Sequence, residues 1–117
     1  MPAVLEDMRS DFDDPAVVNR FAHDFCSTLG GKIDRLDVRL RGGDAMGAAD
    51  AVLSVTTSSA MVGAVRLTQA ALRMQRLIAA DDLDEALHSL PLLRACAADT
   101  VAALGRSYAV GSAGAAP

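Results

Sequence analysis

The stretch of sequence that decides the fold is residues 51–67, AVLSVTTSSAMVGAVRL. Within it and just before it, small and apolar residues recur at steps of three and four, which is the spacing of one face of an α-helix. This stripe consists of Ala48, Val52, Val55, Ser59 and Val62. Its small side chains allow neighbouring helices to approach closely. The next stripe around the helix carries Leu53, which we expect to be exposed.

Upstream, the sequence predicts a long helix. Asp13-Asp14-Pro15 is typical of a helix start, because an aspartate accepts free amide hydrogens and proline fits the first turn. The apolar positions that follow, up to Gly42-Gly43, are Val18, Phe21, Phe25, Leu29, Ile33, Leu36 and Leu40. We expect one helix with a weak point at Gly30-Gly31. The alternative is a break there, since each glycine costs up to about 1 kcal/mol in a helix interior relative to alanine.

Downstream, the sequence predicts two more helices. The first continues the apolar pattern through Leu67, Ala70, Ala71, Met74, Leu77 and Ile78, until residues 79–82 mark a turn. Asp82 with Glu85 resembles a capping box and predicts the start of the last helix. Pro91 should bend that helix or mark a local break. Its expected core face is Leu83, Leu87, Leu90, Ala97, Val101, Leu104 and Tyr108.

These patterns predict an all-α fold, an up-and-down four-helix bundle with short connections. A short leading N-terminal helix is predicted by the spacing of Val4, Leu5 and Met8. With 117 residues and 51% hydrophobic content, the chain can form one compact core. We expect residues 1–110 to form a single domain and residues 111–117, which lack periodicity, to be a flexible tail.

The composition excludes several classes of function. The net charge is −4, with 11 basic residues scattered among 15 acidic ones, so no footprint for nucleic acid is expected. No apolar run approaches the roughly 20 residues needed to span a membrane, and the acidic start is unlike a signal peptide, so we expect a cytoplasmic protein. Cys26 and Cys96 have no metal-site spacing and are expected to be reduced and buried, with a disulfide or metal role as the alternative.

Residues 51–67 also resemble the core motif of histidine-containing phosphotransfer (HPt) domains, commonly written H-x-L-K-G-S-S-x-x-x-G-A-x-x-L. The residues that match the motif without gaps are Ser58, Ser59, Gly63, Ala64 and Leu67, and Val55 stands conservatively for its leucine. Leu53 occupies the position of the phosphorylated histidine, Thr56 that of the lysine and Thr57 that of the first glycine. The resemblance extends over residues 3–108, and the HPt family has the same four-helix bundle.

The resemblance implies a scaffold that has lost its chemistry. Leucine offers no lone pair to a phosphoryl group, and a neutral Thr56 cannot replace the charge of the lysine. The implied function is a phosphotransfer-incompetent HPt-like module, not an enzyme and without cofactor or metal. It would bind a response-regulator receiver domain or a histidine kinase and modulate two-component signalling. The expected partner-binding surface is Ala49, Leu53, Thr56, Thr57 and Ala60. The alternative is a structural helical module that mediates self-association or another protein contact.

A third hypothesis is an active phosphotransferase that uses His23 or His88, the only histidines. Neither has a lysine three residues later, because Cys26 follows one and Pro91 the other, so we expect both to be solvated surface residues. The hydroxyl cluster on the motif helix has no neighbouring base to activate it. Its members, Ser54, Thr56, Thr57, Ser58 and Ser59, are expected to bond to helix carbonyls four residues earlier.

Overall fold

The computed structural model describes the backbone of residues 15–107 and the side chains of residues 20–106. It contains the helices α2 (Pro15–Arg41), α3 (Ala45–Met61), α4 (Val65–Ala79) and α5 (Leu83–Ser107). No strand occurs among residues 15–107, so the all-α prediction is confirmed for this part of the chain. The predicted leading helix at Val4, Leu5 and Met8, the tail at residues 111–117 and the outer ends of the predicted domain lie outside the described residues.

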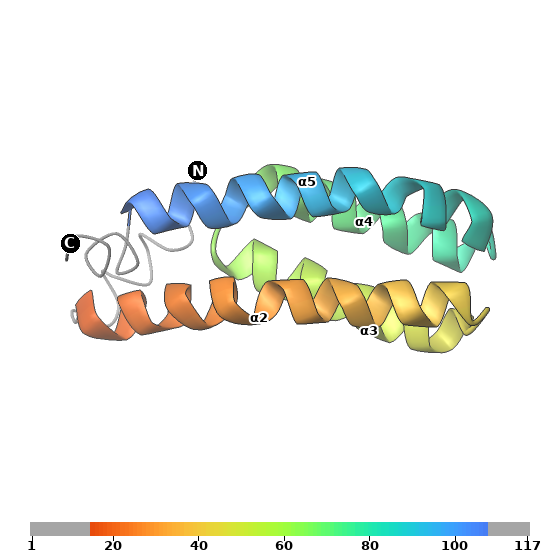
Figure 1. Ribbon diagram of the computed structural model, residues 1–117, viewed down its shortest axis with the longest axis horizontal. Helices are drawn as coiled ribbons and strands as arrows, with labels where there is room; N and C mark the ends of the chain where they lie inside the picture. Colours follow the sequence, from red (N-terminus) through yellow and green to blue (C-terminus); the bar gives the residue numbers. More distant parts are fainter. Residues whose placement is uncertain (1–14, 108–117) are drawn as a thin grey trace.

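The four helices form the expected up-and-down bundle (Figure 1). Each helix packs against two neighbours: α2 and α4 both contact α3 and α5. In Figure 1, α2 and α5 lie in front, and α3 and α4 lie behind them. Because α2 and α5 have 27 and 25 residues, against 17 and 15 in α3 and α4, they are the long pair. The start of α2 and the end of α5 therefore extend beyond the turn between α3 and α4 (Figure 1).

The core contains the apolar stripe that the sequence predicts for α3 and, from Phe25 to Leu40, the one predicted for α2, whereas Phe21 is only half-buried. The α3 stripe of Ala48, Val52, Val55, Ser59 and Val62 is buried along its whole length. In α5 the buried face is broader than predicted, because alanine and cysteine contribute to it. Ala86, Leu93 and Cys96 are buried, whereas Leu83, Leu87 and Val101 are only half-buried. The side chains of Val18 and Tyr108, also expected in the core, are not among those described.

The three connections end their helices in the same way. Gly43, Gly63 and Asp81 adopt left-handed backbone conformations with φ of 71°, 75° and 61°. After each of them, the amide of the next residue donates to a carbonyl five residues earlier at 2.9 Å. This is the Schellman arrangement, in which glycine is usual because it lacks a Cβ. Aspartate is one of the few other residues that tolerate this conformation.

Two of the helix starts are capped by aspartate side chains, of which the sequence pattern predicts the one at Asp82. The Asp44 carboxylate accepts a hydrogen bond from the Gly47 amide at 2.9 Å, at the start of α3. The Asp82 carboxylate accepts one from the Glu85 amide at 3.2 Å, at the start of α5. Each aspartate satisfies an amide that has no partner within the first turn.

Neither break considered for the long helices occurs. α2 continues across Gly30-Gly31, as expected, and α5 continues through Pro91, so of the two outcomes predicted for Pro91 the local break is wrong and the bend stays a prediction. Pro91 removes the amide that would bond to the carbonyl of Leu87, but its ring lies on the exposed side of α5. The buried residues Leu90 and Leu93 on either side hold the helix against the core.

Replacing Gly31 by alanine should stabilise the protein. A Cβ at Gly31 would meet no atom within 4 Å, and its φ is not in the left-handed region. We expect Gly31→Ala to raise the free energy of unfolding by about 0.5–1 kcal/mol, since alanine loses less conformational entropy in a helix. Urea unfolding measures the change. The matched control Gly43→Ala, at φ of 71°, should lower it instead.

Candidate functional site

The exposed side of α3 carries a single charge. Among the 17 residues of the helix only Asp50 is ionisable. Large apolar side chains are exposed at both ends and near the middle: Met46 is 83% exposed, Leu53 52% and Met61 42%. We call this surface the α3 face. It consists of the exposed residues Met46, Ala49, Asp50, Leu53, Thr57, Ala60 and Met61.

The structure brings four of the five predicted partner-binding residues together on the α3 face. These are Ala49, Leu53, Thr57 and Ala60, all exposed. Thr56 is half-buried at the edge of this face. Its hydroxyl lies 3.0 Å from the carbonyl of Val52 and 2.6 Å from the side-chain amide oxygen of Gln75 on α4. Thr56 therefore joins α3 to α4, while Leu53 remains accessible.

An adjoining strip of α4 extends the α3 face. The hydroxyl of Thr68 donates to that of Ser59 at 3.0 Å, so Thr68 and Gln75 mark the side of α4 that lies against α3. Leu72 falls between them, one turn from each, and is exposed. Sequence reasoning treated α4 only as a source of core residues. The signal it missed is that Leu72 is out of phase with the buried Ala71 and Met74.

The charges of α4 are all positive. α4 has no acidic residue. Its three basic residues are the exposed arginines Arg66, Arg73 and Arg76. Arg73 lies 3.9 Å from the Glu85 carboxylate on α5, an exposed pair that contributes little to stability. The weakly charged α3 face is therefore bordered by a basic helix.

The opposite edge of the α3 face contains an amine that sequence reasoning did not place. The Nζ of Lys32 on α2 donates to the hydroxyls of Ser54 at 3.0 Å and Ser58 at 3.1 Å. The hydroxyl of Ser59 bonds within the helix, to the Thr56 carbonyl at 3.0 Å. The prediction of hydroxyls bonded to carbonyls four residues earlier thus fits Thr56 alone. Lys32 is 22 and 26 residues from its partners, a separation that leaves no local pattern.

Both histidines are exposed, as the sequence predicts, and neither lies on α3. His23 is on α2 and His88 is near the start of α5. The Nδ1 of His88 lies 3.8 Å from a carboxylate oxygen of Glu85. A carboxylate at this distance would repel an incoming phosphoryl group. Neither histidine therefore takes the place on α3 that the phosphorylated histidine has in the resembled motif, where Leu53 stands.

The two cysteines are free thiols. Cys96 is buried, and Cys26 is half-buried rather than buried as expected. Burial raises the pKa of the Cys26 thiol, which reduces its thiolate fraction near neutral pH. Among residues 15–107, no group of three or more His, Cys, Asp or Glu side chains is arranged to hold a metal ion.

Comparisons with known proteins identify no relative. No family model, no curated protein and no solved structure matches the chain. Within the described helices, none is both long enough and apolar enough to cross a membrane. The geometry of the α3 face and the motif within it are therefore the features that indicate a function.

Proposed function

We propose that this protein is a phosphotransfer-incompetent HPt-like module that docks a receiver domain or a histidine-kinase component through the α3 face. The observation that carries the proposal is the half-exposed Leu53 near the middle of a face with one charge. This leucine stands where the resembled motif has its phosphorylated histidine. The module would modulate two-component signalling by occupying a docking surface, without transferring a phosphoryl group.

Physical chemistry favours a contact of this kind. An exposed leucine, with Leu72 beside it on α4, offers apolar area whose removal from water is favourable without any proton transfer or metal. The phosphoacceptor of a receiver domain is an aspartate, so the partner surface that approaches Leu53 is acidic. The arginines of α4 complement such a surface and would accelerate its association.

The alternative function, self-association, is favoured by the spacing of the exposed apolar residues on α3. Met46, Leu53 and Met61 are seven and eight residues apart. Residues seven and eight apart lie within about 80° of one another around a helix, so the three side chains share one face. Two α3 faces could therefore pack against each other in a symmetric dimer.

Leu53→Asp tests the α3 face. Truncating a buried anchor of an interface commonly costs at least about 2 kcal/mol, which corresponds to roughly 30-fold in affinity. We expect at least this loss of binding to a receiver domain or histidine kinase from the same organism, measured by titration calorimetry. The helical melting curve should hardly change, because the side chain is 52% exposed.

The matched control is Leu92→Asp. Leu92 is 53% exposed, and it lies on α5 rather than on α3 or α4. This variant should bind as the wild type does. Sedimentation of the chain alone separates the two functions: a dimer that Leu53→Asp dissociates supports self-association. If Leu53→Asp folds, binds every tested partner and sediments as the wild type does, the docking role of this face is refuted.

A further inference from the structure

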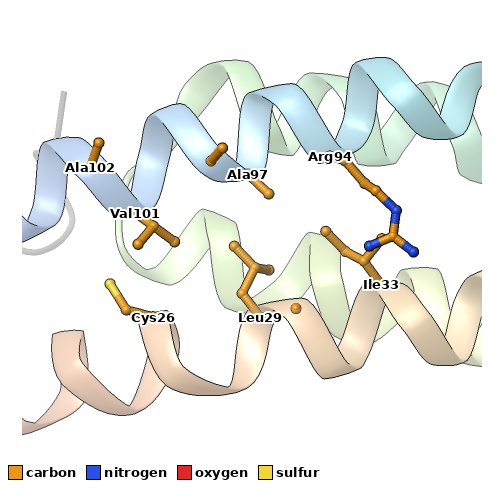
Figure 2. A pocket seen from close by; sticks show the side chains of 9 residues that line it. Cys26, Leu29, Ile33, Arg94, Ala97, Val101 and Ala102 are labelled. Atoms are coloured by element: carbon orange, nitrogen blue, oxygen red, sulfur yellow. The ribbon is translucent and has the colours of Figure 1, made fainter.

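An apolar groove lies between α2 and α5, away from the α3 face (Figure 2). Its volume is about 450 Å³. Leu29, Ile33 and Ala97 line its inner side, and Cys26 and Val101 face each other across it (Figure 2). These side chains are mostly apolar, so water in the groove finds few hydrogen-bonding partners.

The groove exists because the facing side chains are small. α2 contributes Gly30, and α5 contributes Ala98 and Ala102. A Cβ added at Gly30 would meet no atom within 4 Å. One end is closed by the guanidinium of Arg94, which lies 2.9 Å from the Asp34 carboxylate and 3.3 Å from that of Asp37. The other end leads towards the start of α2, which residues 1–14 precede in the sequence.

The length of that preceding segment matches the position of the groove. Cys26 lies 11 residues into α2, or about 16 Å along the axis from Pro15 at 1.5 Å per residue. Residues 10–14, fully extended, span about 17 Å. Residues 3–9, if helical, add about 10 Å, which is the axial distance from Cys26 to Ile33. The segment can therefore turn back beside α2 and reach the groove without strain.

The chemistry of the segment also fits an apolar groove. Its apolar residues recur at the spacing of one helical face: Met1, Val4, Leu5, Met8 and Phe12. The five acidic residues and one arginine among residues 1–14 fall between these positions or directly after the last of them. These charges give the segment a net charge of −4, equal to that of the whole chain. A helix of this pattern would bury its apolar side in the groove and leave its acidic side in water.

We propose that the groove between α2 and α5 is the docking site of the chain's own residues 3–9, with Val4, Leu5 and Met8 facing Leu29, Ala97 and Val101. This contact is independent of the function proposed above, because it involves neither α3 nor Leu53. It also makes the accessibility of Cys26 depend on whether the segment is bound.

Disulfide trapping tests the contact directly. In a Cys96→Ala background, Cys26 is the only native thiol. Met8→Cys places a second thiol on the side of the segment that faces the groove. Asp7→Cys places one on the charged side, about 100° further around the same helix. Disulfides require Cα atoms roughly 4.4–6.8 Å apart, so under mild oxidation we expect Met8→Cys to bond to Cys26 at least about ten-fold faster than Asp7→Cys. Mass spectrometry of the monomer measures both rates.

Equal trapping rates for the two variants would overturn the proposal, because they would mean that the segment has no preferred face. Predominantly intermolecular disulfides would also overturn it and would assign the groove to a second copy of the chain. A second measurement uses the Cys96→Ala chain without an added thiol. Leu5→Ser with Met8→Ser should raise the rate at which Cys26 reacts with a maleimide by about ten-fold or more, since protection requires a closed contact.

The rate at which Cys26 of the Cys96→Ala chain reacts with the maleimide should not depend on protein concentration. Protection that grows with concentration would again indicate a second copy of the chain in the groove. An unchanged rate in the serine variant would show that residues 3–9 do not cover Cys26. In both cases the proposed contact fails, while the docking role of the α3 face is untouched.

Discussion

Val55→Asp should unfold the domain or leave it without a cooperative transition. Val55 is fully buried in the centre of the core stripe of α3. A carboxylate introduced into this apolar core would lose its hydration, a change that falls among the most destabilising single substitutions, at more than about 4 kcal/mol. Domains of this size have total stabilities of only about 5–15 kcal/mol. Thermal unfolding followed by circular dichroism measures the loss.

Leu53→Asp provides the matched comparison for Val55→Asp. The same side chain is introduced two residues away on the same helix, at a position that is half-exposed. Its melting temperature should stay within a few degrees of the wild-type value, whereas that of Val55→Asp should fall by at least roughly 15 °C. If the two variants were equally unstable, Leu53 would be part of the core and the described α3 face would be incorrect.

Local patterns explain why so much of the fold could be predicted. The residues on the buried side of a helix are three or four positions apart in the sequence. The burial of Val52, Val55 and Ser59 therefore follows from their spacing alone. The helix start at Asp82 and the helix end at Gly43 depend only on contacts within a few residues. The local break that was one of two outcomes predicted for Pro91 does not occur, because packing on both sides of a residue can outweigh its local preference.

The parts of the site that were not predicted depend on distant residues. Lys32 meets Ser54 and Ser58 across the contact between α2 and α3, and Leu72 joins the α3 face only because Gln75 meets Thr56. Neither contact has a signature in a single sequence, because the rotation of one helix against the next sets it. The groove between α2 and α5 is similar, since it arises from small residues that are far apart in the chain.

The wild-type chain should acquire no phosphohistidine under conditions that load an ordinary HPt protein. Leu53 cannot accept a phosphoryl group, and the half-buried Thr56 supplies no positive charge. His23 and His88 are exposed on other helices, and His88 has the Glu85 carboxylate beside it. Incubation with a labelled phosphorylated receiver domain or histidine kinase should leave no acid-labile label on the chain. Label that disappears in His23→Gln or His88→Gln would contradict this expectation.

A double variant that restores the histidine and the lysine of the motif should gain the ability to accept a phosphoryl group. In Leu53→His with Thr56→Lys, the imidazole would occupy the half-exposed position on α3, and the amine would lie one turn later on the same side. If the bundle retains the approach surface of the resembled family, the variant should take up acid-labile label from a donor that leaves the wild type unlabelled. Leu53→His alone should take up less, because the cationic helper is absent. Failure of a well-folded double variant to accept label from any such donor would mean that receivers do not approach this face, and the α3 face would then be better explained by self-association.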